Sequence, residues 1–190
     1  MPNAFGTRIT NPETQYPQAW ERAGNVKLLV LDVDGVLTNG QVWIGSDGKE
    51  ALKAFDIQDG LGIKLLEQSG IPTAIITGRN SKMVLARCEE LGIKYVHMGV
   101  ENKALALDKV LKVLGLSASD CAIMGDDWPD LAMLKNAGFR VCPAQGHEAV
   151  KALAHYVTTH SGGNSAVREV CDLILKAQNR YEDLLTKACQ

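Results

Sequence analysis

Residues 26–36 are Val-Lys-Leu-Leu-Val-Leu-Asp-Val-Asp-Gly-Val, an apolar run that ends in two acids and a glycine. The run predicts a buried β-strand, and side chains that alternate along a strand place Asp32 and Asp34 on the same side at its end. Gly35 lets the chain turn away sharply. Two carboxylates this close repel each other, and their burial is costly unless a cation or a proton offsets the charge. The pair therefore predicts a metal site, acid–base chemistry, or both.

A helix followed by a strand repeats along the middle of the chain. Apolar residues at helical spacing precede the glycines at 70, 92, 115 and 138, and a glycine just past a helix is the usual left-handed cap. The apolar runs after these glycines predict strands at 71–77, 94–98, 120–125 and 139–142. Such alternation predicts an α/β fold with a doubly wound, mostly parallel sheet of the Rossmann-like type.

One segment breaks this alternation directly after the acids. Strand-like residues flank the turn at 45–48, which predicts a β-hairpin at about 41–55. Its aromatic residues, Trp43 and Phe55, either face a core or contact another copy of the chain. We expect an N-terminal arm at 1–25, a single domain at 26–190, and a C-terminal helix at about 166–185.

Composition excludes several classes of protein. The chain has 190 residues, 46% of them hydrophobic and 22% charged, with a net charge of −2. This near-neutral balance favours neither a nucleic-acid surface nor a polybasic membrane patch. No apolar stretch approaches the roughly 20 residues of a membrane span, and no apolar signal segment precedes Arg22. Five cysteines without a C-x-x-C pair favour free thiols and a cytoplasmic protein.

Polar residues follow each predicted strand, at the sheet edge where open α/β folds bind their ligands. Acids hold hard cations such as Mg²⁺, whereas a hydroxyl, a lysine and glycine-flanked amides suit phosphate oxygens. Together these groups predict a phosphoryl-transfer site. The residues are Asp32 and Asp34 after the first strand, Thr77, Gly78 and Arg79 after the second, Lys103 after the third, and Asp126 and Asp127 after the fourth.

Four spaced motifs resemble those of the haloacid-dehalogenase-like phosphatases, in order and in spacing. They are Asp32-x-Asp34-Gly-Val-Leu-Thr, Thr77-Gly-Arg, Lys103, and Gly125-Asp126-Asp127-x-x-Asp130-Leu. The resemblance implies that Asp32 is a nucleophile that forms an aspartyl-phosphate, and that Asp34 is the acid and then the base. It also implies that Thr77 binds the transferred phosphoryl group and that Lys103 neutralises its charge.

The same resemblance implies the cofactor and its ligands. Mg²⁺ would be held by Asp32, by the backbone carbonyl of Asp34 and by Asp126, with Asp127 as a supporting or water-mediated ligand. Residue types taken alone are compatible with more ordinary roles. Lys103 also suits a solvated helix charge, and Asp126 and Asp127 suit helix capping. Asp130 is expected to be structural.

Residues 55–64, 125–131 and 166–170 narrow the resemblance to enzymes that act on a small phosphorylated sugar acid, an eight-carbon keto acid with phosphate on carbon 8. This implies a role in lipopolysaccharide precursor synthesis. No segment is long enough for a cap domain, so the resemblance implies a homotetramer in which hairpins associate and neighbouring subunits cover each site. The expected substrate contacts are Gly78, Arg79, Asp59, Gly60 and Lys64.

Two positions depart from this narrower pattern. Asn164 and Gln58 stand where relatives carry arginine. The departures leave room for a related substrate, a nine-carbon keto sugar acid 9-phosphate or another small sugar phosphate. A non-catalytic scaffold of the same fold is the remaining alternative, although all the predicted catalytic residues are present.

Overall fold

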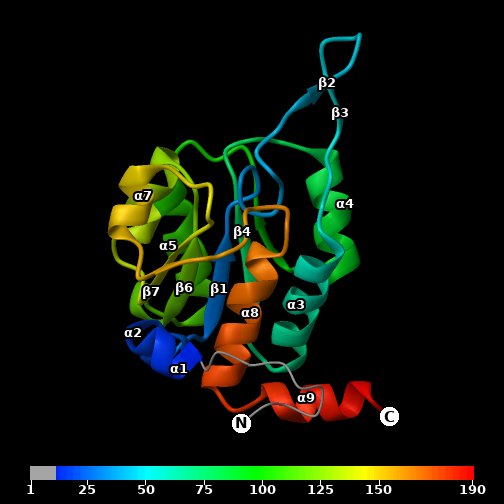
Figure 1. Cartoon of the computed structure of the whole chain (residues 1–190). Helices are drawn as coiled ribbons and strands as arrows, with labels where there is room; N and C mark the ends of the chain where they lie inside the picture. The colour runs from blue at the N-terminus through cyan, green and yellow to red at the C-terminus, as the bar shows by residue number, and fades with distance from the viewer. Residues whose placement is uncertain (1–11) are drawn as a thin grey trace.

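The structure, a computed structural model, describes residues 12–190 and contains a six-stranded parallel sheet covered by helices on both faces (Figure 1). The strand order is β5-β4-β1-β6-β7-β8. This arrangement confirms the predicted α/β fold. The strands are β1 (Leu28–Leu31), β4 (Thr73–Ile76), β5 (Tyr95–His97), β6 (Cys121–Met124), β7 (Phe139–Cys142) and β8 (Tyr156–Val157).

Strand β1 lies at the centre of the sheet and is buried on both faces. Leu31 is in register with Ile75 of β4 on one side and with Met124 of β6 on the other. Leu29 and Leu31 pack into one hydrophobic core, whereas Leu28 and Val30 pack into a second core on the opposite face. A strand covered on both faces has no polar positions, which explains the uninterrupted apolar sequence. The acids begin where this burial ends.

The helices form two layers. One layer contains α2 (Pro17–Gly24), α3 (Ile57–Gln68), α4 (Lys82–Leu91) and α8 (Ala166–Ala177). The other contains α5 (Lys103–Leu114), α6 (Leu131–Leu134) and α7 (Glu148–Leu153). As predicted, left-handed glycines end α4 and α5, at Gly92 and Gly115. The remaining helical segments are α1 (Pro12–Gln15), η1 (Ala118–Asp120), η2 (Trp128–Asp130) and α9 (Tyr181–Ala188).

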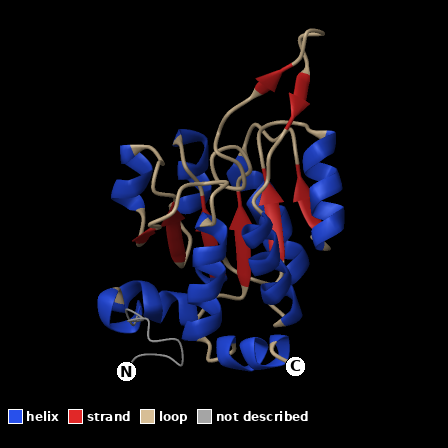
Figure 2. Cartoon of the chain, turned by 45° about the vertical axis from the view of Figure 1, so that its right-hand side comes forward, coloured by secondary structure: helices blue, strands red, loops and turns tan. Residues whose placement is uncertain are grey.

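A two-stranded hairpin projects beyond the carboxyl ends of the sheet strands (Figures 1 and 2). It consists of β2 (Trp43–Ile44) and β3 (Glu50–Leu52), paired antiparallel. Trp43 and Ile44 are exposed, while Phe55 is partly buried against the core of the α3–α8 layer. Of the two roles expected for these aromatics, Phe55 therefore takes the core role and Trp43 does not.

The two ends of the chain differ from the predicted arm and helix. Residues 1–11 of the expected arm lie outside the described residues, but α2 packs on α8, with Ala19 and Ala23 buried. The predicted C-terminal helix at about 166–185 is two helices, because α8 ends at Ala177 and Asn179 has a left-handed φ of 56°. Within residues 12–190, no helix is long and apolar enough to cross a membrane.

Candidate active site

Three acids meet at the carboxyl ends of β1 and β6. The ligand oxygens of Asp32, Asp126 and Asp130 all lie within 4.8 Å of one another. Asp32 follows β1 directly, and its backbone N–H donates to the carbonyl of Met124 at 3.2 Å. Gly35 has a φ of +91°, and a Cβ at this position would overlap the Asp126 carboxylate. The sequence Asp-x-Asp-Gly therefore both supplies one acid and makes room for another.

Burial and mutual repulsion disfavour the charged forms of two of these acids. Burial, followed by the charge of Asp130, raises the pKa of Asp32 to about 6. Burial, followed by the charges of Asp130 and Asp32, raises the pKa of Asp126 to about 7. A divalent cation bound among the carboxylates would relieve both effects. The cluster therefore fits Mg²⁺, which prefers oxygen ligands.

Lys103 lies inside this acid cluster rather than on a solvated helix face. It is 5% exposed, and its Nζ lies 2.8 Å from Asp32 Oδ1 and 2.6 Å from Asp130 Oδ1. Burial alone would lower the pKa of Lys103, but the two carboxylates raise it above its ordinary value. The ammonium group therefore stays charged beside the predicted nucleophile. The Asn102 side chain caps α5 by accepting from the Leu105 N–H. The cap fixes the start of the helix, and Lys103 is its first residue.

Asp130 has the structural role expected of it, whereas Asp127 lies apart from the acid cluster. The Asp130 Oδ2 accepts from the backbone N–H of Asp126 at 3.0 Å, so Asp130 holds both Asp126 and Lys103 in place. Asp127 is exposed and accepts from the Trp128 N–H at 2.8 Å, which caps η2. Within residues 12–190, the carboxylate of Asp126 has no protein hydrogen-bond donor. Asp126 is therefore free to bind a metal ion, whereas Asp127 lies outside the cluster.

The segment after β4 reaches the same edge of the sheet. Thr77 is buried, and its backbone is fixed by hydrogen bonds to His97 and Val100. Arg79 is exposed beyond Gly78, and its Nε lies 3.8 Å from Asp34 Oδ2. The structure thus brings Arg79 beside the predicted acid–base residue.

Lys53, at the base of the hairpin, reaches Asp34 and is also paired with Glu50, and sequence reasoning missed both residues. Lys53 Nζ forms an ion pair with Asp34 Oδ1 and lies 2.9 Å from Glu50 Oε1. Burial acts to raise the pKa of Glu50, but the hydrogen bond and charge of Lys53 hold that pKa below its usual range. The sequence offered one signal for this pair: Glu50 and Lys53 are oppositely charged and three residues apart, in the segment that follows Asp32 and Asp34.

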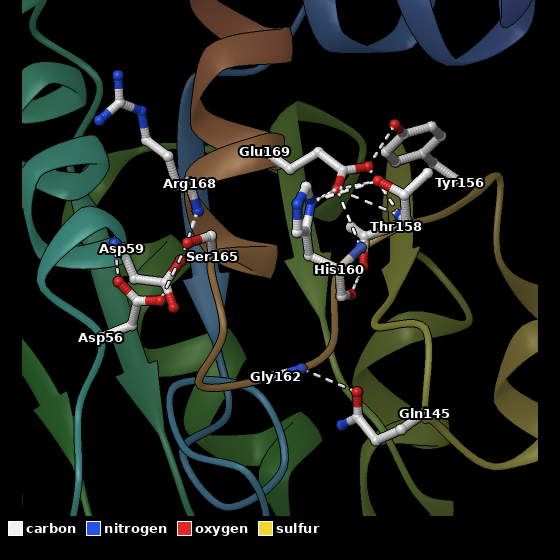
Figure 3. Close-up of polar contacts among 11 residues, drawn as sticks. Asp56, Asp59, Gln145, Tyr156, Thr158, His160, Gly162, Ser165, Arg168 and Glu169 are labelled. Carbon is white, nitrogen blue, oxygen red and sulfur yellow. Dashed lines mark hydrogen bonds and ion pairs between the residues drawn. The ribbon is translucent and has the colours of Figure 1, made fainter.

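Three residues of α3, Asp59, Gly60 and Lys64, were expected to contact substrate, and that role stays a prediction. Asp59 is buried, and its Oδ1 accepts from the backbone N–H of Arg168 at 2.7 Å (Figure 3). Gly60 packs so closely on Arg87 that a Cβ would overlap its guanidinium group, and Lys64 is exposed. The contacts that the structure describes for Asp59 and Gly60 run to α8 and α4. The structure therefore does not bring these three residues to the acid cluster.

The loop at 161–165 supports the turn that follows Asp34. The Gln145 side chain donates to the carbonyl of Gly35 at 2.6 Å and accepts from the Gly162 N–H at 2.8 Å. Figure 3 shows Gln145 facing Gly162 across this contact. Gly163 donates to the carbonyl of Val36 at 3.0 Å. The backbone of this loop is therefore hydrogen-bonded to the segment that carries both predicted catalytic acids.

Gln58 and Asn164, the two departures from the narrower pattern, line one groove along α8. The groove has a volume of about 570 Å³, and the acid cluster does not contribute to it. Arg168 pairs there with Asp172 at 2.7 Å, and His160 lies 2.6 Å from Glu169. Neither departure therefore lies in the acid cluster.

Comparison with known proteins gives the family. A family model described as a haloacid dehalogenase-like hydrolase matches residues 97–170. Over 167 residues the chain is 42% identical to the 3-deoxy-D-manno-octulosonate 8-phosphate phosphatase KdsC of Salmonella typhimurium, covering 88% of each protein. The chain belongs to the haloacid dehalogenase-like hydrolases. This membership confirms the predicted activity class, phosphoric monoester hydrolase.

Solved structures agree with the fold of this haloacid dehalogenase-like hydrolase. The 3-deoxy-D-manno-octulosonate 8-phosphate phosphatase of Moraxella catarrhalis is described in complex with a magnesium ion, a phosphate ion and a KDO molecule. It is 48% identical, with a TM-score of 0.86 over 90% of this chain and 97% of that one. A probable YrbI family phosphatase of Pseudomonas syringae is 40% identical, with a TM-score of 0.89 over 92% and 98% of the two chains. Together with the acid cluster, the family confirms Mg²⁺ as the predicted cofactor.

Proposed function

We propose that this hydrolase converts 3-deoxy-D-manno-octulosonate 8-phosphate to the free sugar acid and phosphate. One observation carries the proposal: Asp32, Lys103 and Asp126, from three separate motifs, gather at the end of β1. The names of the relatives, which cover most of the chain, support the choice of substrate. The proposal places the reaction in lipopolysaccharide precursor synthesis.

In the proposed reaction, Asp32 and Asp34 take consecutive roles. A carboxylate oxygen of Asp32 forms a bond to phosphorus while the ester P–O bond breaks, and Asp34 gives its proton to the departing sugar oxygen. Asp34 then takes a proton from a water molecule whose oxygen attacks the aspartyl-phosphate. Phosphate leaves, and Asp32 recovers its carboxylate. The ester and one water molecule thus become an alcohol and phosphate.

In this proposal Lys103 balances the negative charge of the phosphoryl group, and Thr77 binds and orients that group. The ammonium group of Lys103 already lies 2.8 Å from Asp32, where the phosphoryl group would be transferred. Asp32, the backbone carbonyl of Asp34, and Asp126 would hold Mg²⁺. The ion supplies charge neutralisation for the phosphate oxygens and for the clustered acids. Asp130 keeps Lys103 and Asp126 in position.

Substrate choice rests on Arg79 and on neighbouring subunits. Arg79 is half exposed at the rim of the site, where its guanidinium can bind the sugar-acid carboxylate. The exposed apolar side chains along the hairpin strands support the proposal of a homotetramer whose subunits cover each other's sites. Five free cysteines, four of them buried, support a cytoplasmic location.

The proposal is tested by phosphate release from 3-deoxy-D-manno-octulosonate 8-phosphate by the purified protein. We expect turnover with Mg²⁺ and none after chelation. Asp32→Asn is expected to reduce turnover by about 10⁴-fold or more, because it removes the nucleophile while the amide fills the same space. Its circular dichroism should match that of the original protein. Full activity of Asp32→Asn would exclude the aspartyl-phosphate route.

A substrate panel separates the proposed substrate from its alternatives. The nine-carbon keto sugar acid 9-phosphate and simple sugar phosphates should give lower kcat/KM values than the eight-carbon 8-phosphate. A higher value for the nine-carbon ester would replace the proposed substrate. Binding of phosphate without turnover of any ester would instead favour the non-catalytic scaffold.

A further inference from the structure

The base of the hairpin is connected to Asp34 through a buried lysine. Lys53 lies just after β3, and its side chain is 1% exposed. Its ammonium group lies between two carboxylates, Oδ1 of Asp34 and Oε1 of Glu50. Glu50 is also 3.5 Å from an Nη of Arg79. The otherwise exposed hairpin thus ends in a chain of charged groups around a buried lysine, and this chain includes the proposed acid–base residue.

The two carboxylate oxygens of Asp34 have different surroundings. Oδ1 accepts from Lys53, whereas Oδ2 faces the Nε of Arg79 at 3.8 Å, at the open rim. An ammonium group only donates, so it pairs best with the unprotonated, more basic oxygen of a carboxylic acid. Because Lys53 occupies Oδ1 and Oδ2 lies at the open rim, a proton on Asp34 is favoured on Oδ2.

We propose that Lys53 is a positioning residue that makes Oδ2 of Asp34 the oxygen that gives and takes the proton. This inference rests on the proposed function, in which Asp34 serves as acid and then as base. In the first step the Oδ2–H proton passes to the ester oxygen as the bond from that oxygen to phosphorus breaks. In the second step Oδ2 takes a proton from the attacking water.

Glu50 explains how Lys53 stays in place during this cycle. Asp34 is neutral before the first step and charged after it, so its attraction for the ammonium group changes. A buried ammonium that lost its only carboxylate partner would be strongly unfavourable. Glu50, at 2.9 Å, keeps Lys53 paired in both states. The lysine therefore fixes the orientation of Asp34 throughout the reaction.

Leaving groups of different basicity give a readout that a purely structural role would not change. An alkyl phosphate needs a proton on its departing oxygen, whereas p-nitrophenyl phosphate releases a stable phenolate without one. Because kcat/KM reports only the steps up to formation of the aspartyl-phosphate, it isolates the acid role of Asp34. If a residue acts through this proton, its substitution must therefore change kcat/KM unequally for the two substrates.

The test compares Lys53→Met with the original protein on the sugar-acid phosphate and on p-nitrophenyl phosphate. We expect kcat/KM for the alkyl ester to fall about 10- to 100-fold, part of the benefit of general acid catalysis, and the aryl value to fall less than about threefold. Lys53→Arg should recover most of the loss. Lys49→Met is the matched control, because Lys49 is an exposed lysine of the same hairpin, and it should change neither value. Equal losses on both substrates would overturn the proposal.

A second measurement does not depend on the identity of the substrate. In a crystal structure of Lys53→Met, the Asp34 carboxylate should adopt a different orientation from that in the original protein. An unchanged orientation would overturn the positioning role even if the sugar-acid phosphate proved not to be a substrate. If the protein did not hydrolyse the sugar-acid phosphate but did hydrolyse other esters, a simple primary alkyl phosphate would replace it in the kinetic comparison. That result would count against the proposed substrate alone.

Discussion

Asp59 shows how one buried acid stabilises a helix end and makes the fold sensitive to pH. Its carboxylate accepts from the Arg168 N–H at the start of α8, and its Oδ2 is buried without a hydrogen-bond partner among residues 12–190. Burial raises the pKa of Asp59 from 3.8 to about 6. The folded protein therefore holds a proton that the unfolded chain releases between these values. The resulting stabilisation is complete below pH 4 and is lost as pH rises through 6.

Asp59→Asn is expected to reduce this pH dependence. The asparagine oxygen can still accept from Arg168, but the side chain cannot ionise. Two pKa units correspond to about 3 kcal/mol, so the loss of unfolding free energy between pH 4 and pH 7 should shrink by up to about that amount. Urea unfolding at a series of pH values measures it. Asp183→Asn, on the exposed face of α9, is the control, and identical pH slopes for Asp59→Asn and the original protein would contradict the prediction.

The elements were predicted to different extents because their sequence signals differ in length. Strands β1, β4 and β6 coincide with largely apolar segments of four residues, and glycine caps mark the ends of α4 and α5. The break between α8 and α9 was missed because Asn179, unlike glycine, gives little indication of a left-handed turn. Strand β8 has two residues, too few for a periodic pattern.

The loop at 161–165 shows the same limit, because its packing depends on a segment that is distant in sequence. A Cβ on Gly162 would overlap the backbone carbonyl of Gly35. Gly162→Ala should therefore displace the turn after Asp34, lower the unfolding free energy by about 1–3 kcal/mol and reduce turnover. Gly24→Ala is the matched control, since its Cβ would meet only Ala177 O at 3.7 Å. Unchanged melting temperature and activity for Gly162→Ala would contradict the described packing.

At the scale of the whole molecule, the four motifs could be placed from sequence because parallel strands bring their carboxyl ends to one edge. The contacts of Asp59, Lys53 and Asp130 could not be placed in the same way. Asp59 faces a helix more than a hundred residues away in sequence, and Lys53 reaches the site from a hairpin whose direction no local pattern defines. Residues at strand ends are thus predictable, whereas residues that hold them depend on tertiary packing.

The hairpin strands also carry a prediction about the assembled molecule. Val42, Trp43, Ile44 and Leu52 are all exposed, and such an apolar patch on a single chain is unfavourable in water. If hairpins associate in the proposed homotetramer, Trp43→Lys should lower the molar mass in solution from four chains to one, as measured by light scattering. Turnover should fall with it, because an isolated subunit leaves its acid cluster open to water. Val113→Lys replaces another exposed apolar residue, on α5, and should preserve the tetramer. A Trp43→Lys protein of unchanged mass would place the subunit contact elsewhere on the surface.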